Sequence, residues 1–264
     1  MLFFVVCFSY LSLVLEPLNW LVLAPSLTLR PNRRSHLIGG WLKFQTRVVL
    51  TLARILAGLR FEMHGAIEPT SSIVVMNHQS VFDILVGLSL IGGPYPLIPT
   101  RASYGFGIPG ISSLIKLMRC PLVTQQAVIP RSQLRALLDA AGQVARGEQS
   151  LLIYPEGHRS RNGSIQPFMK PGLRLFLSRA RERPVYVAVV DGLGHLRTFA
   201  DTALRVAGSI GRVQVRGPYN TPPEDVELDG FIDSLRDQMV GILAELRRGD
   251  PELAARDSGG IPLP

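Results

Sequence analysis

Cysteine is scarce in this chain. Its 264 residues include only Cys7 and Cys120, too few for a disulfide framework, which favours a reducing, cytoplasmic setting for the main domain. The two cysteines and five histidines do not fall at zinc-ligand spacings, so we expect no metal site. The sequence also lacks a phosphate-binding P-loop and any recognised nucleic-acid-binding motif, which argues against nucleic acid as a partner.

One glycine-rich motif, Gly105-Phe-Gly107-Ile-Pro-Gly110, matches the dinucleotide-binding fingerprint in its spacing. We reject that interpretation because a proline lies inside the motif and no clear strand leads into it. In addition, no acidic residue stands between Asp83 and Asp139 to bind a ribose. The motif instead predicts a flexible turn into an apolar helix that lines a pocket.

Acidic residues are missing from residues 17–61, which contain seven Lys and Arg. Residues 17–138 carry twelve Lys/Arg against three Asp/Glu, or +9, whereas residues 139–264 carry sixteen of each, and Glu16 brings the total to +8. A basic half beside an apolar terminus favours binding to anionic membrane lipids, at about 1 kcal/mol for each cation near the surface. A generally arginine-rich protein is the alternative interpretation.

Residues 1–29 hold a single charge, Glu16, which lies between a mostly apolar run at residues 1–15 and a nearly apolar one at residues 18–29. Pro17 and Pro25 interrupt the stretch. No cation precedes the first run, so we do not expect a cleaved secretory signal. The segment is long enough to cross a bilayer with a kink, but it also fits a re-entrant pair of short helices or a helical hairpin buried in a core. If it spans, the three arginines in residues 30–34 place the following domain in the cytoplasm.

Residues 41–60 predict a basic amphipathic helix. Lys43, Arg47 and Arg54 fall near one face at spacings of four and seven, and apolar residues from Trp41 onward supply the other face. Such a helix is typical of a membrane interface, although helices of soluble domains share the pattern.

Beyond residue 70, short apolar runs alternate with helical stretches, which predicts an α/β domain with a mostly parallel central sheet flanked by helices. The expected strands are residues 73–76, 97–99, 121–124, 151–154, 185–190 and 212–216. The expected helices are residues 82–91, 108–118, 132–146, 171–181 and 228–247. We therefore expect an apolar membrane-associated segment at 1–40, the α/β domain at 41–248 and a mobile tail at 249–264.

Two polar clusters follow predicted strands, at the strand ends where open α/β sheets place their ligands. The first is Asn77-His78-Gln79-Ser80 with Asp83. The Asp83 carboxylate can accept a hydrogen bond from one imidazole nitrogen of His78, which leaves the other nitrogen to take a proton from an alcohol. No serine lies in a Gly-x-Ser-x-Gly elbow, so direct attack by the acceptor's own hydroxyl is the simpler mechanism. A His and an Asp five positions apart are also common by chance.

The second cluster, Tyr154-Pro-Glu156-Gly157-His158-Arg159, offers hydrogen-bond donors for an anion. Gly157 lets the backbone approach a ligand closely, and the planar Arg159 guanidinium matches phosphate oxygens. Glu156 can orient that arginine or accept from a ligand hydroxyl. A polar surface hairpin with an ordinary ion pair is the alternative for this cluster.

Together the clusters resemble the signature blocks of the glycerolipid acyltransferase family, which includes the 1-acylglycerol-3-phosphate acyltransferases. The likeness lies in the first cluster, in Tyr154-Pro-Glu-Gly-His-Arg-Ser-Arg161, and in Gly163 with Pro167-Phe-Met-Lys170-x-Gly172. It covers approximately residues 40–216. The resemblance implies an α/β fold with an amino-terminal helical pair that dips into the membrane. It also implies acyl transfer from a thioester of coenzyme A or acyl carrier protein to a lysophospholipid, with no other cofactor.

The resemblance also assigns roles to residues. His78 would be the general base and Asp83 its partner. The expected substrate-binding residues, which include those that hold the acceptor phosphate, are Asn77, Ser80, Arg101, Glu156, Gly157 and Arg159.

Two departures from the family pattern concern the acceptor. His158 stands where the family usually has threonine, and the arginine that commonly ends the second block aligns near Gln125. The cations that could replace that arginine are Arg101, Lys116 and Arg119. We expect transfer to 1-acylglycerol-3-phosphate, giving phosphatidic acid. Another lysophospholipid or a lyso-aminolipid is the second hypothesis for the acceptor, and a non-catalytic lipid-binding module is a third hypothesis from another class.

Overall fold

A six-stranded sheet forms the centre of the protein, in the order β1-β8-β7-β2-β6-β3. The computed structural model describes residues 1–124 and 130–248, so Gln125 and the predicted tail at 249–264 lie outside the described residues. The sheet strands are β1 (Arg60–His64), β2 (Ile73–Met76), β3 (Pro96–Leu97), β6 (Ser150–Ile153), β7 (Val185–Asp191) and β8 (Ile210–Tyr219). Two short strands, β4 (Thr100–Arg101) and β5 (Leu122–Val123), pair separately with each other.

The strand directions bring both polar clusters to one edge of the sheet. β2 runs parallel to its neighbours β6 and β7, and within the described sheet only the β7–β8 pairing is antiparallel. The carboxyl ends of β2, β6 and β7 therefore meet at the same edge. The predicted α/β fold with a mostly parallel sheet is confirmed.

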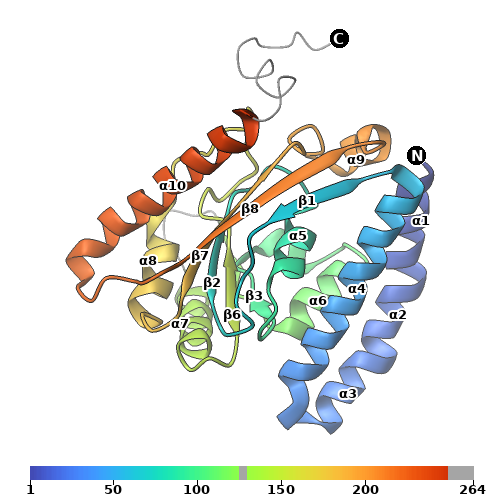
Figure 1. Cartoon of the computed structure of the whole chain (residues 1–264). Coiled ribbons are helices and arrows are strands. Elements are labelled where there is room, and N and C mark those ends of the chain that lie inside the picture. Colours follow the sequence, from blue (N-terminus) through green and yellow to red (C-terminus); the bar gives the residue numbers. More distant parts are fainter. Residues whose placement is uncertain (125–129, 249–264) are drawn as a thin grey trace.

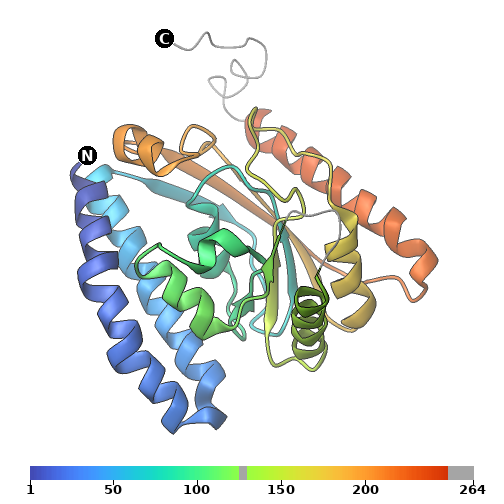
Figure 2. The ribbon, with the colours of Figure 1, turned by 180° about the vertical axis from the view of Figure 1, so that it is seen from behind.

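Helices cover both faces of this sheet (Figures 1 and 2). On one side lie α7 (Arg131–Ala145), α8 (Lys170–Arg179) and α10 (Leu228–Arg248). On the other side lie α4 (Arg34–Ala57), α5 (Asp83–Leu90) and α6 (Ile111–Met118). A short helix that the sequence did not predict, α9 (Phe199–Arg205), lies beside the amino-terminal end of the chain and begins at a Thr198–Asp201 capping box.

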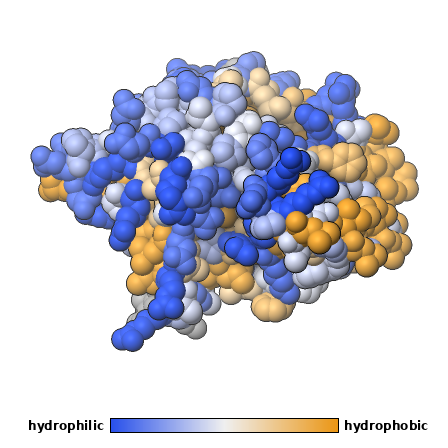
Figure 3. Space-filling view, turned by 90° about the horizontal axis from the view of Figure 1, so that it is seen from below, coloured by the Kyte–Doolittle hydropathy of each residue, from blue (hydrophilic) through white to orange (hydrophobic). Residues whose placement is uncertain are grey.

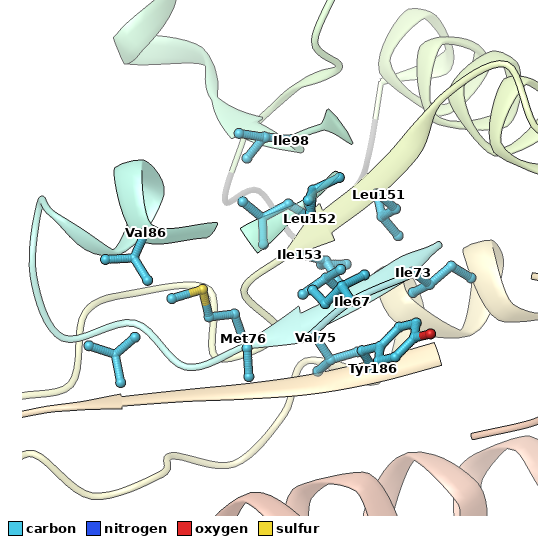
Figure 4. Packing of buried hydrophobic residues seen from close by; sticks show 14 of the residues in the cluster. Ile67, Ile73, Val75, Met76, Val86, Ile98, Leu151, Leu152, Ile153 and Tyr186 are labelled. Carbon is cyan, nitrogen blue, oxygen red and sulfur yellow. The ribbon is translucent and has the colours of Figure 1, made fainter. Parts of the chain in front are cut away.

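Because both faces are covered, the central strands are buried along their whole length. All four residues of β2 and all seven of β7 are buried, which is why these strands read as continuous apolar runs. Figure 4 shows Met76 of β2 beside Val86 of α5, and Leu152 of β6 in the same core. Gly87 lets α5 pack closely on the sheet, since a Cβ there would lie 2.5 Å from Leu152 Cδ2. This packing places the first residue of α5, Asp83, next to the end of β2.

The predicted helix over residues 41–60 is wrong at both ends. α4 begins at Arg34 and ends at Ala57, because Gly58 adopts a left-handed conformation (φ 67°) that terminates the helix. The following strand β1 was not predicted, because the expected helix was extended over Arg60, although Arg60-Phe-Glu-Met-His64 alternates polar and apolar residues. As an edge strand it leaves four of its five residues exposed. The boundary that we expected between residues 40 and 41 falls inside α4, and the division into regions stays a prediction.

Residues 2–29 form one long apolar helix that neither proline breaks. Its α-helical parts are α1 (Leu2–Ser9), α2 (Glu16–Leu18) and α3 (Ala24–Leu29), and its π-helical turns are η1 (Tyr10–Leu15) and η2 (Asn19–Leu23). With α4 it forms a hairpin at one side of the molecule (Figure 1). Within the described part of the chain, Leu2–Leu29 is the one helix long and apolar enough to cross a membrane, judged by length and composition alone.

The exposed surface of this hairpin is largely apolar along Leu2–Leu29, whereas α4 also exposes Lys43, Arg47 and Arg54. Its exposed large hydrophobic residues are Met1, Leu2, Val5, Phe8, Leu13, Val14, Trp20, Leu21, Val22, Leu29, Phe44 and Ile55. Figure 3 shows hydrophobic surface gathered over the side of the molecule that carries the amino-terminal helices. The interpretation as a hairpin buried in a core is therefore wrong, and an apolar surface of this extent is typical of a membrane or protein interface.

Candidate active site

The end of β2 and the start of α5 bring His78 and Asp83 together. His78 Nδ1 lies 3.0 Å from Asp83 Oδ2, and the same oxygen accepts the main-chain N–H groups of Gln79 (2.5 Å) and Ser80 (2.7 Å). The Asp83 side chain is fully buried, whereas the His78 side chain is 18% exposed. The Tyr154 ring packs against the imidazole, with ring centroids 4.6 Å apart. The backbone thus fixes the carboxylate, the carboxylate fixes the imidazole, and Nε2 is the ring nitrogen left for a substrate.

The second cluster lies directly against His78. The Glu156 carboxylate accepts the main-chain N–H of His78 (2.9 Å) through one oxygen and that of Gln166 (2.9 Å) through the other. In return, the main-chain N–H of Ser160 donates to the His78 carbonyl (2.7 Å). Glu156 is buried, and burial raises the pKa of its carboxyl group although the two N–H donors act in the opposite direction. Glu156 therefore joins the two clusters through the protein backbone.

Asn77 and Ser80, which we expected to bind substrate, also have side chains bonded within the protein. Asn77 exchanges two hydrogen bonds with the main chain of Val190 on β7, at 2.8 and 2.7 Å. Ser80 Oγ donates to the Leu196 carbonyl (2.9 Å) and accepts the N–H of Phe82 (3.2 Å). Both side chains are buried. This geometry favours positioning of the His78 segment over direct contact with a substrate.

Arg101 and Arg159 extend the site towards β4 and the turn η4 (Ala102–Gly105). Arg101 Nη2 donates to the Gly157 carbonyl (2.9 Å), so the structure places this arginine beside the second cluster. Arg159 Nη2 donates to the Tyr104 hydroxyl (3.2 Å), and Nη1 donates to the Arg197 carbonyl. These bonds use two of the several N–H donors of a guanidinium, so Arg159 can hold an anion at the same time.

Gly157 allows a backbone conformation that other residues rarely adopt. Its φ is 70°, and a Cβ at this position would lie 2.4 Å from Met169 Sδ. The sequence predicted that a ligand approaches the Gly157 backbone closely, but in the structure the Met169 side chain occupies that position. The left-handed conformation of Gly157 turns the loop from Glu156 towards Arg159.

A polar network that was not predicted from the sequence lies behind the site. Gln79 Nε2 donates to the Gly163 carbonyl (3.0 Å) and to Asp191 Oδ1 (3.4 Å). Arg247, near the end of α10, donates to Asp191 Oδ2 (2.9 Å) and to the Gly163 carbonyl (2.8 Å). Arg247 is 56 and 84 positions from these partners in sequence, so no local pattern could have revealed the network.

The described residues were also compared with the arrangement that a metal site requires. Across residues 1–124 and 130–248, no group of three or more His, Cys, Asp or Glu side chains is arranged to hold a metal ion. The candidate site consists of an oriented imidazole and nearby guanidinium groups, which suits proton transfer from an alcohol beside an anion.

Comparison with known proteins identifies the family. A family model described as Acyltransferase matches residues 60–204, which is 145 of the 264 residues and includes both clusters. The chain belongs to this acyltransferase family. The acyltransferase is 26% identical to mouse (Mus musculus) 1-acyl-sn-glycerol-3-phosphate acyltransferase alpha over 208 residues, covering 76% of this chain and 69% of the mouse protein. It is 37% identical to the chloroplastic 1-acyl-sn-glycerol-3-phosphate acyltransferase BAT2 of Brassica napus over 170 residues, covering 64% of this chain and 47% of that protein.

A solved structure shares the fold of this acyltransferase. The crystal structure of the 1-acyl-sn-glycerophosphate acyltransferase from Thermotoga maritima matches with a TM-score of 0.67 at 19% sequence identity, covering 92% of each chain. This likeness confirms the architecture. Family membership makes the protein an O-acyltransferase, which argues against the non-catalytic lipid-binding hypothesis.

Proposed function

We propose that this acyltransferase moves a fatty acyl group from an acyl thioester to the free hydroxyl of 1-acylglycerol-3-phosphate, giving phosphatidic acid. The observation that carries the proposal is the imidazole of His78, held by a buried carboxylate and joined through main-chain hydrogen bonds to the loop of Arg159. The names of the relatives support the same acceptor.

In the proposed reaction His78 Nε2 takes the proton of the acceptor hydroxyl as the hydroxyl oxygen attacks the thioester carbonyl. The new C–O bond forms, the C–S bond breaks, and the thiolate leaves with the proton from the imidazolium. Asp83 stabilises the imidazolium between these steps, at a distance of 3.0 Å. Arg159, with Arg101 nearby, holds the acceptor phosphate, and no acyl-enzyme forms.

We also propose that the reaction takes place at a membrane surface, with the catalytic domain on the cytoplasmic side. The exposed apolar surface of the hairpin supports insertion, and the basic, acid-free stretch at residues 17–61 supports attraction to anionic lipids. The acceptor then comes from the membrane and the donor, a thioester of coenzyme A or acyl carrier protein, comes from water.

An acceptor panel tests the substrate. Purified protein in mixed micelles receives labelled acyl-CoA and, in turn, 1-acylglycerol-3-phosphate, other lysophospholipids or a lyso-aminolipid. We expect the highest kcat/KM with 1-acylglycerol-3-phosphate. A preference for an acceptor without a phosphate group would refute the proposed acceptor and leave the acyl transfer intact.

Substitution of His78 tests the base. His78→Ala should lower kcat by roughly 10²–10⁴-fold, the usual contribution of a general base. His64→Ala is the matched control, because His64 is exposed on the edge strand β1. Full activity in a folded His78→Ala protein would remove His78 from the mechanism.

Substitution of Arg159 tests the phosphate site. Arg159→Ala should raise the KM of the acceptor about 10- to 100-fold, since hydrogen bonds to charged groups contribute roughly 1.5–3 kcal/mol, with little change in the KM of the thioester. Arg161→Ala, at an exposed arginine two positions later, is the control. Equal acceptor KM values in the wild type and Arg159→Ala would exclude this role.

A further inference from the structure

The one charge of the amino-terminal helix, Glu16, is bound to the catalytic domain. Glu16 Oε2 accepts the main-chain N–H of Gly110 (2.7 Å) and the hydroxyl of Ser113 (2.6 Å), while Oε1 accepts the indole N–H of Trp20 (2.8 Å). Gly110 immediately precedes α6, so the carboxylate sits at the amino-terminal end of that helix, where the helix dipole favours an anion. A carboxylate in an otherwise apolar helix is costly without such partners, which indicates a specific attachment.

Asn19 makes a second attachment one turn later in the same helix. Its side chain is fully buried, and Nδ2 donates to the Gly110 carbonyl (3.1 Å) and to Ser113 Oγ (2.8 Å). Asn19 Oδ1 accepts the indole N–H of Trp41 on α4 (2.9 Å). Residues three apart lie on the same face of a helix, so Glu16 and Asn19 bind the start of α6 together and include α4 in the contact.

The backbone packs closely at this attachment. Gly110 has a φ of 73°, and a Cβ there would lie 3.0 Å from both the Leu11 carbonyl oxygen and Leu15 Cδ2. The carbonyl belongs to the helix backbone and cannot turn away. The amino-terminal helix therefore determines where the start of α6 lies.

From α6 the contacts continue to the proposed phosphate site. Ser112 Oγ accepts the N–H of Ile108 (3.0 Å) and donates to the Tyr104 carbonyl (2.9 Å). The Tyr104 hydroxyl accepts from Arg159 Nη2 (3.2 Å). The glycine-rich turn that we rejected as a dinucleotide site thus connects the amino-terminal helix at one end to the Arg159 guanidinium at the other.

We propose that Glu16 is a positioning residue for the acceptor site, acting through the start of α6 and the Tyr104 hydroxyl on Arg159. The proposal rests on the proposed role of Arg159 in holding the acceptor phosphate. According to this proposal, the packing of the apolar helix against the catalytic domain influences the affinity for a lipid acceptor. Because this route ends at the arginine proposed to hold the acceptor phosphate, we expect the KM of the thioester to be independent of Glu16.

The test compares Glu16→Ala, Tyr104→Phe and the double variant in mixed micelles, with KM measured separately for 1-acylglycerol-3-phosphate and acyl-CoA. Each single variant should raise the acceptor KM about tenfold, as expected for one hydrogen bond to a charged group. The acyl-CoA KM and kcat should stay within about twofold of the wild type. The acceptor KM of the double variant should equal that of Tyr104→Phe alone, because Glu16 acts through the Tyr104–Arg159 hydrogen bond that Tyr104→Phe has already removed.

Two further variants control for local damage. Among the described residues, Ser26 Oγ donates only within its own helix, to the Val22 carbonyl (2.6 Å), so Ser26→Ala should leave both KM values unchanged. Glu16→Gln keeps an oxygen for the Gly110 N–H and should recover part of the lost acceptor affinity. An unchanged acceptor KM in Glu16→Ala, an equal rise in both KM values, or effects that add in the double variant would each overturn the proposal.

Failure of the proposed function would be seen separately. It would show as no turnover of 1-acylglycerol-3-phosphate by the wild type, or as an unchanged acceptor KM in Arg159→Ala. Circular dichroism checks whether Glu16→Ala folds. If it does not, Glu16→Gln and Tyr104→Phe complete the test, and acceptor KM values equal to that of the wild type in both refute the proposal.

Discussion

Replacing Asp83 by asparagine separates two tasks of this carboxylate, which are to orient the imidazole and to stabilise its positive charge. Oδ2 accepts three N–H groups, from His78 Nδ1 and from the main chain of Gln79 and Ser80. An amide nitrogen cannot accept these bonds, so the backbone forces the asparagine carbonyl oxygen into the position of Oδ2. His78 then keeps its orientation and its Nδ1–H tautomer, and the variant loses only the negative charge.

The size of the effect follows from this division. A hydrogen bond to a charged group contributes roughly 1.5–3 kcal/mol against about 1 kcal/mol for a neutral one, so Asp83→Asn should lower kcat about 2- to 30-fold. Asp83→Ala also loses the orientation of His78, and kcat should fall by roughly 10²–10⁴-fold, as for loss of the base itself. Both variants should lose stability. The alanine variant leaves two buried N–H groups unpaired, and the asparagine NH₂ would occupy the position of Oδ1, which has no hydrogen-bond partner among the described residues.

The assay is kcat at saturating acceptor and thioester, normalised to the folded fraction from thermal unfolding followed by circular dichroism. We expect Asp83→Asn to retain at least about three times the activity of Asp83→Ala. Asp139→Asn, at an exposed carboxylate on α7, is the control for a change of charge alone. A folded Asp83→Asn protein as slow as Asp83→Ala would show that the backbone does not select the oxygen, and the reasoning would be refuted.

Three further predictions concern the residues around this pair. Gly157→Ala imposes a φ of 70° on a residue with a Cβ and brings that atom 2.4 Å from Met169 Sδ, so unfolding free energy should fall by about 1–2 kcal/mol in thermal melts; Met169→Ala in the same chain should restore only the steric part. Asn77→Ala leaves the N–H and the carbonyl of Val190 without their partner, and a melting temperature equal to that of the wild type would contradict the expected loss of roughly 2–4 kcal/mol. Burial raises the pKa of Glu156 above its ordinary 4.5, so the folded protein keeps a proton that the unfolded chain releases. Stability should therefore fall as pH rises from 4.5 through the raised pKa, and melts across this range should show a smaller slope for Glu156→Gln.

Features that depend on neighbouring residues could be predicted from the amino-acid sequence alone. The buried strand β2 is a continuous apolar run, and His78 and Asp83 stand five positions apart at the junction of a strand and a helix. A pair so close in sequence needs only the local turn to meet. The order and spacing of the two clusters were likewise sufficient to indicate the family, because they depend on residue types and not on the positions of distant segments.

The contacts of several of these polar residues depend instead on how distant elements pack. Asn77 bonds to Val190, 113 positions away, and Glu156 bonds to the main chain of His78, 78 positions away. Those hydrogen bonds depend on the strand order β7-β2-β6, which cannot be predicted from the individual apolar runs. The role of Glu16 was hidden for the same reason: its partners Gly110 and Ser113 reach it only when α6 packs on the amino-terminal helix. Residue type shows that a side chain needs a partner, but only the packing of distant elements determines which partner it finds.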